Sequence, residues 1–164
     1  MCEICKAARG DLAEILALQY ISYQSEAQLY DDRDIPPLRQ TLEEVEAEFD
    51  SGIILKMTDK DNKIIGSVRA KAKNGTVYIG KLIVHPEHRR KGYGTRLLNE
   101  IGRYCPDMRC ELFTGSKSID NIRLYERNGY SPFDRKTVSG GLEFIYLEKL
   151  PDHSADQAGR DNDL

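Results

Sequence analysis

The stretch LIVHPEHRRKGYGTRLL, residues 82–98, decides the fold of this chain. It opens with three aliphatic residues that end an apolar run beginning at Val77, a pattern typical of a buried strand. Pro86 ends that strand, because proline cannot donate the next ladder hydrogen bond. From Thr95 onward the apolar residues recur at helical spacing. The stretch therefore predicts a strand, a turn, a basic glycine-rich loop and a helix.

The loop between this strand and this helix has the composition of a phosphate site. Three cations, Arg89-Arg90-Lys91, precede Gly92-Tyr93-Gly94. The first amides of a helix lack intrahelical partners and favour negative charge, and glycine lets the backbone approach a ligand. For an isolated G-x-G, a solvated basic surface is the alternative. A dinucleotide fingerprint is excluded by Leu97, where glycine or alanine is required, and no Walker A motif is present.

A second motif lies at residues 121–130, which read NIRLYERNGY. Asn121 and Tyr125 are four residues apart, so they share one face of a helix. Taken alone, Tyr125 is a core aromatic residue and Asn121 a first-turn residue.

Together the two motifs resemble the signatures of the GNAT (GCN5-related N-acetyltransferase) family. Arg89-x-x-Gly92-x-Gly94 after a strand is similar to its acetyl-CoA signature, and Asn-x-x-x-Tyr followed by Gly129-Tyr130 is similar to its second signature. The motifs span residues 82–130, and the order of elements extends the resemblance over residues 2–150.

The resemblance implies an α+β fold, a mixed α/β sandwich with a mostly antiparallel sheet of six to seven strands and about four helices. We expect residues 1–150 to form a single acetyltransferase domain, and the polar residues 151–164 to form a disordered tail. The expected strands cover residues 2–7, 53–58, 64–73, 76–84, 108–114, from 130 onward, and 142–150. The expected helices cover residues 12–30, 42–50, 95–104 and 118–128.

Local signals support several of these elements. Asn74-Gly75 predicts a tight hairpin, and Thr41 with Glu44 predicts a capping box. Lys81 interrupts an apolar alternation, which is consistent with a bulge. Asp11 is a candidate N-cap, and the prolines of residues 31–37 predict a loop.

The resemblance also implies acetyl-CoA as cosubstrate and transfer of its acetyl group to a primary amine by direct attack, through a tetrahedral intermediate. Tyr125 would be the general acid for the departing thiolate, since a phenol with a pKa of about 10 is protonated at neutral pH. The implied acetyl-CoA contacts are Leu82, Ile83, Val84, Arg89, Arg90, Lys91, Gly92, Tyr93, Gly94, Thr95 and Asn121.

The general base and the acceptor are less defined. Glu111, on an expected strand, is a candidate base, with His85 or a chain of waters as alternatives. An acidic segment at residues 26–34, formed by Glu26, Asp31, Asp32 and Asp34, would attract a cationic amine, although a solvated loop has the same composition. Polyamines, aminoglycosides, amino acids and protein N-termini all remain open as acceptors. A non-catalytic acyl-CoA-binding sensor or interaction module is the alternative function.

Composition limits the remaining classes. The net charge of −3 and the short basic cluster argue against nucleic-acid binding. No apolar run approaches the ~18 residues of a membrane span and no signal-peptide pattern is present, so we expect a cytoplasmic protein without membrane partners. Cys2-x-x-Cys5 has no second ligand pair, which favours structural thiols over a metal or redox site. A homodimer remains open.

Overall fold

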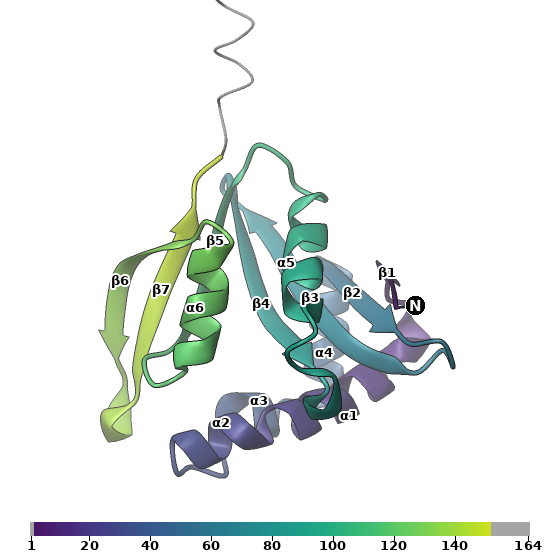
Figure 1. The fold of residues 1–164 in the computed structure, drawn as a ribbon, viewed down its shortest axis with the longest axis horizontal. Helices are drawn as coiled ribbons and strands as arrows, with labels where there is room; N and C mark the ends of the chain where they lie inside the picture. The colour runs from purple at the N-terminus through teal and green to yellow at the C-terminus, as the bar shows by residue number, and fades with distance from the viewer. Residues whose placement is uncertain (1, 152–164) are drawn as a thin grey trace, which may run out of the picture.

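A seven-stranded sheet in the order β1-β2-β3-β4-β5-β7-β6 forms the centre of the protein (Figure 1), seen in a computed structural model that describes residues 2–151. All neighbouring strands are antiparallel except β4 and β5, which are parallel, so the predicted mostly antiparallel sheet is confirmed. The strands are β1 (Glu3–Lys6), β2 (Ile53–Thr58), β3 (Ile64–Lys73), β4 (Thr76–Val84), β5 (Arg109–Gly115), β6 (Ser131–Thr137) and β7 (Glu143–Lys149).

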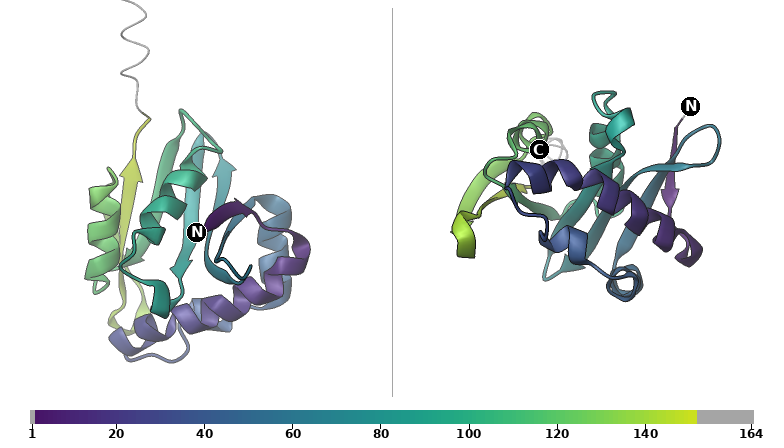
Figure 2. Two further views of the ribbon diagram at one scale, coloured as in Figure 1. Left: turned by 45° about the vertical axis from the view of Figure 1, so that its right-hand side comes forward. Right: turned by 90° about the horizontal axis from the view of Figure 1, so that it is seen from below.

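Helices cover both faces of the sheet, as the sandwich prediction requires. Figures 1 and 2 show α5 and α6 on one face and α1 and α4 on the other. Leu97 and Ile101 of α5 pack with Val77 in one core cluster, whereas Ile15 of α1 packs with Val45 of α4 in the second. The helices are α1 (Leu12–Ser22), α2 (Gln24–Leu29), α3 (Pro36–Arg39), α4 (Leu42–Ser51), α5 (Tyr93–Gly102) and α6 (Ile119–Arg127).

Two local sequence signals are confirmed. Asn74 and Gly75 both have positive φ, 52° and 82°, and form the turn between β3 and β4. At the start of α4 the Glu44 amide donates to Thr41 Oγ1 over 3.3 Å, and the Thr41 amide donates to Glu44 Oε1 over 3.1 Å. This reciprocal pair is the predicted capping box.

The N-terminal third differs from the prediction in three places. The expected helix over residues 12–30 breaks at Tyr23 into α1 and α2. The helix α3 begins at Pro36 inside the expected loop, because a first-turn residue needs no amide hydrogen. Asp11 does not cap α1, since its carboxylate instead accepts from the Ala8 amide at 2.8 Å and pairs with Lys56 at 2.8 Å.

A bulge and a separation of strands shape the middle of β4. Arg69 of β3 pairs with Gly80 while Ser67 pairs with Ile83, and Lys81 between them has a φ of 49°, which confirms the predicted bulge. On the other side, pairing between β4 and β5 runs only from Thr76 to Tyr78. The two parallel neighbours therefore diverge from Tyr78 towards the end of β4.

No helix within the described range is both long and apolar enough to cross a membrane. The predicted tail, apart from Pro151, lies outside that range, so its disorder stays a prediction.

Candidate active site

The open edge of β4 is the first component of the candidate site. Beyond Tyr78 this strand keeps β3 on one side, where Ile83 and Val84 pair with Ser67 and Gly66. On its other side the pairing with β5 has already ended, so half of its backbone groups face no strand. An unpaired strand edge can accept an extended molecule as an additional strand. The predicted contacts Leu82, Ile83 and Val84 all lie on this edge.

The glycine-rich loop follows β4 and leads into α5. Arg90 and Gly92 both adopt the left-handed conformation, with φ of 63° and 79°, so the backbone folds back on itself before the helix. Within the described residues, the amides from Arg90 to Thr95 donate to no protein acceptor, and the first helical bond in this region runs from the Arg96 amide to Gly92. These free donors at a helix N-terminus suit a phosphate group.

The loop side chains point to different partners. Arg89 donates from Nη2 to the Ser22 carbonyl at 2.8 Å and from Nη1 to Ser25 Oγ at 3.1 Å, which ties the loop to the junction of α1 and α2. Tyr93 accepts from Cys2 Sγ at 3.4 Å. Arg90 and Lys91 are exposed, so both remain able to meet an anion.

A polar cluster joins α2 to the start of α6. Glu26 accepts from Ser118 Oγ at 2.6 Å and from Asn121 Nδ2 at 3.3 Å, while Asn121 also donates to Thr114 Oγ1 at 3.3 Å. The Tyr30 hydroxyl lies 3.0 Å from Ser118 Oγ. Ser118 stands at the predicted N-cap, but its side chain makes no capping bond and bonds Glu26 instead.

Glu26 is a candidate functional residue that the sequence does not distinguish from its acidic neighbours. It belongs to the acidic segment of residues 26–34, and there it had no priority over Asp31, Asp32 and Asp34. Those three aspartates are exposed, whereas Glu26 is half-buried and bonded to α6. A carboxylate offers about four lone-pair positions, and the two bonds here leave others for a ligand. Its spacing in the sequence carries no signal for this long-range contact.

Tyr125 lies on the same helix as Asn121 and is buried against the sheet. Burial raises the pKa of its phenol well above the ordinary value, and the nearby phenol of Tyr23 and carboxylate of Glu26 raise that pKa further. Tyr125 is therefore neutral at physiological pH and able to donate a proton.

Glu111 and His85, the two side chains that the sequence offers as the general base, lie outside this polar cluster. Glu111 accepts from Arg109 Nη1 at 2.9 Å and occupies the last row in which β4 and β5 pair, opposite Tyr78. His85 uses Nδ1 to accept from the Glu87 amide at 3.1 Å, in the turn after β4. Neither residue is joined to the cluster of Glu26, Ser118 and Asn121 by a hydrogen bond within the described residues.

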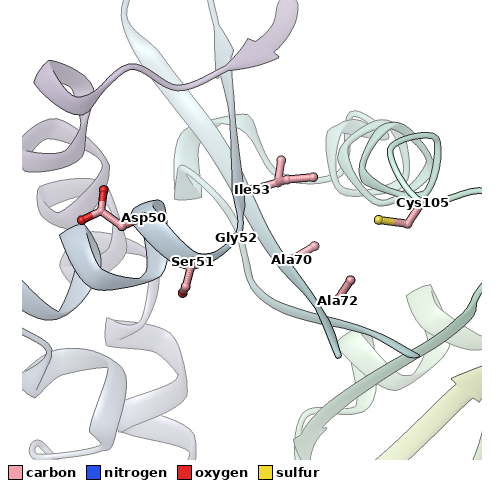
Figure 3. Close-up of a pocket in the computed structure, with 7 residues that line it drawn as sticks. All are labelled: Asp50, Ser51, Gly52, Ile53, Ala70, Ala72 and Cys105. Carbon is pink, nitrogen blue, oxygen red and sulfur yellow. The ribbon is translucent and has the colours of Figure 1, made fainter. Parts of the chain in front are cut away.

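A pocket of about 360 Å³ lies at a different place (Figure 3). Its lining comes from the end of α4 and the start of β2, from β3, and from Cys105 after α5. None of the predicted site residues lines it, so the free strand edge and the loop amides, rather than this pocket, mark the candidate site.

Comparison with known proteins agrees with this geometry. The chain is similar to UPF0157 protein YqkA of Bacillus subtilis, with 26% identity over 139 residues, 84% of this chain and 40% of that protein. It therefore spans about two fifths of the length of that curated relative.

Several solved acetyltransferases share the fold. The ribosomal-protein-S18-alanine N-acetyltransferase of Escherichia coli has a TM-score of 0.75 at 14% identity, covering 91% of this chain and 93% of the other. The PaiA N-acetyltransferase of Thermoplasma acidophilum, solved with coenzyme A, has a TM-score of 0.74 at 19% identity, covering 92% and 99%. A phosphinothricin acetyltransferase of Sinorhizobium meliloti, solved with acetyl-CoA, has a TM-score of 0.75 at 18% identity, covering 94% and 91%.

The family model described as "Acetyltransferase (GNAT) family" matches residues 11–130, a range that includes the loop, the open edge of β4 and both sequence motifs. This chain belongs to the GNAT acetyltransferase family.

Proposed function

We propose that this protein is an acetyl-CoA-dependent N-acetyltransferase that transfers the acetyl group to a primary amine. The observation that carries the proposal is the edge of β4 beyond Tyr78, which has lost β5 as its partner directly before a loop of unpaired amides. Membership of the family and the presence of coenzyme A or acetyl-CoA in structures of the same fold support it.

The residues present fit this cosubstrate. Backbone groups of Leu82, Ile83 and Val84 would bond its extended pantetheine arm as a further strand, and an amide near Val84 would polarise the thioester carbonyl. The amides from Arg90 to Thr95 would hold the pyrophosphate, with the guanidinium groups of Arg89 and Arg90 adding charge-assisted bonds.

Glu26 is our candidate for the group that holds the cationic amine and takes its proton. It is the carboxylate that the structure brings next to Asn121, and it acts on the pKa of Tyr125. Glu111 remains the alternative base, although its carboxylate is already engaged in an ion pair with Arg109. A positioned base typically contributes about 100-fold or more to the rate.

The proposed reaction then balances. The amine gives a proton to Glu26, and its nitrogen attacks the thioester carbon to form the tetrahedral intermediate. The carbon–sulfur bond breaks and the departing thiolate takes the phenolic proton of Tyr125. The attacking nitrogen loses its second proton to the Tyr125 phenolate as the amide forms, and Glu26 passes the first proton to water. Holding the two reactants on one strand edge replaces a bimolecular encounter by a positioned one.

The test is acetyl transfer from acetyl-CoA to a panel of amines, followed by mass spectrometry of the product, for wild type and Tyr125→Phe. We expect amine-dependent acetylation, and a kcat reduced about 100-fold in Tyr125→Phe. The matched control is Tyr130→Phe, since Tyr130 is equally buried in the same core cluster but is not part of the proposed proton transfer.

Each other outcome has a definite meaning. Equal rates for wild type and Tyr125→Phe would remove Tyr125 as the acid and leave the enzyme. Acetyl-CoA binding in calorimetry without turnover on any amine would replace the enzyme by an acyl-CoA-binding sensor. Absence of acetyl-CoA binding would overturn both functions.

A further inference from the structure

A second polar cluster lies on the sheet face that α1 and α4 cover, and Arg69 of β3 is its centre. Arg69 is only 5% exposed. Its Nη2 donates to Gln19 Oε1 at 2.6 Å, and its Nη1 donates to Gln40 Oε1 at 2.9 Å and pairs with Glu48. Its Nε is buried and has no acceptor among the described residues. The cluster therefore holds a fixed positive charge with one donor unused.

Lys81 adds a second positive charge to this cluster. It stands in the bulge of β4, directly after Gly80, which pairs with Arg69. Lys81 is half-buried, and in the described part of the chain its amine has no ion-pair or hydrogen-bond partner. Burial lowers the pKa of this amine and Arg69 lowers it further, while Glu48 and Glu44 act in the opposite direction.

The charges of the cluster do not balance. Glu48 is bonded to Arg69, and Glu44 is exposed and occupied by its capping box with Thr41. Two cations thus face one closely bound carboxylate. A half-buried, unpaired amine is unfavourable because it has lost water and gained no anion, and a bound anion would remove that cost.

The cluster adjoins the candidate active site through the junction of α1 and α2. On α1, Gln19 accepts from Arg69, and Ser22, three residues further on, donates from Oγ to the Val84 carbonyl at the end of β4 at 3.5 Å. The helix α2, which carries Glu26, begins two residues after Ser22. Lys81 also lies on the part of β4 that has separated from β5. The open part of β4 therefore carries Lys81, and its end contacts the end of α1, next to the helix that carries Glu26.

We propose that the acceptor is an amino carboxylic acid, whose carboxylate is bound by Lys81 next to Arg69 while its amine is held at Glu26. This inference rests on the proposed acetyltransferase function and narrows its substrate class. Polyamines and aminoglycosides carry no carboxylate and would leave Lys81 unpaired, so they are poor acceptors in this scheme. A charge-assisted bond from a partly buried amine discriminates an acid from its neutral amide by about 10-fold or more.

The first arm of the test measures binding, so that it does not depend on turnover. N-acetyl derivatives of α-, β- and γ-amino acids, each with its matched primary amide, are titrated by calorimetry into the protein saturated with CoA. We expect at least one acid to bind about 10-fold more tightly than its amide. That preference should be lost in Lys81→Gln and kept in Lys81→Arg. Lys71→Gln, an exposed lysine of β3, is the matched control and should keep the preference.

The second arm measures acetylation of the free amino acids and their amides. We expect Lys81→Gln to raise KM for the acids about 10-fold and to leave KM for the amides unchanged. Equal binding of acids and amides by wild type, including no binding of either, would overturn the inference. A preference for acids that persists in Lys81→Gln would overturn it as well. A different result would contradict the proposed acetyltransferase function itself: no acetylation of these compounds or of any amine in the wider panel.

Discussion

Asn121 of α6 donates from Nδ2 to Oε1 of Glu26 on α2 over 3.3 Å, across 95 positions of sequence. The bond joins the second sequence motif to the acidic segment that precedes the first prolines. It brings the Glu26 carboxylate to the helix that carries the buried phenol of Tyr125. The proposed proton acceptor, Glu26, and the proposed proton donor, Tyr125, therefore come from two different helices.

We expect Glu26→Gln to lower kcat/KM about 100-fold, because the amide cannot take the proton of the amine. The neutral side chain can still bond Ser118 and Asn121, so the melting temperature should change little. Glu43→Gln, an exposed glutamate of α4, is the control for a lost negative charge. Steady-state kinetics of both variants and of Glu111→Gln decide between the two candidate bases. Retained activity in Glu26→Gln with loss in Glu111→Gln would assign the base to β5.

The raised pKa of Tyr125 predicts the alkaline side of the pH profile. Because burial lifts this pKa above its ordinary value of about 10, the phenol keeps its proton throughout pH 7 to about 9.5. We therefore expect no fall of kcat in this range from loss of the acid. Tyr125→Phe should lower kcat by the same factor at every pH in the range. A descending limb below about pH 9.5 that disappears in Tyr125→Phe would contradict the assignment.

Gly92 and Gly102 provide opposite predictions for the same substitution. Gly92 precedes α5 with a φ of 79° and has open space around it, so alanine there costs about 1 kcal/mol through conformation alone. Gly102 lies in the last turn of α5 without positive φ or close neighbours, and alanine there should add about 0.5 kcal/mol. Urea denaturation measures both. We expect weaker acetyl-CoA binding for Gly92→Ala only. Equal weakening in both variants would contradict the assignment of this loop to acetyl-CoA binding.

The lowered pKa of Lys81 predicts a pH dependence of stability. A lysine whose folded pKa lies below its unfolded value of about 10.5 binds its proton less tightly in the folded state, so its charge destabilises the fold at neutral pH. Stability should recover as pH rises from the folded pKa towards the unfolded one. Lys81→Met should raise the free energy of unfolding by about 1 kcal/mol at pH 7 and by less at pH 9.5. Thermal melts at the two pH values, taken as the difference between wild type and variant, test this. A destabilised Lys81→Met at pH 7 would show that the amine already has a stabilising partner.

Many elements follow from local sequence because their causes are local. The hairpin at Asn74-Gly75, the capping box of Thr41 and Glu44 and the bulge at Lys81 each depend on the conformational preferences of a few neighbouring residues. The break at Tyr23 and the helix starting at Pro36 were missed, since the packing of this segment against the sheet decides them and proline is tolerated in a first turn.

By itself, the sequence determined the strand, loop and helix of residues 82–98 and the helical face shared by Asn121 and Tyr125, because those arrangements depend on periodicity and on glycine and proline chemistry. Only the tertiary structure decided that β4 separates from β5 beyond Tyr78, that Glu26 meets Asn121, and that Lys81 stands unpaired beside Arg69 within the described chain. These are relations between distant segments. Their energies come from burial and from charges brought together by folding, which no window of neighbouring residues contains.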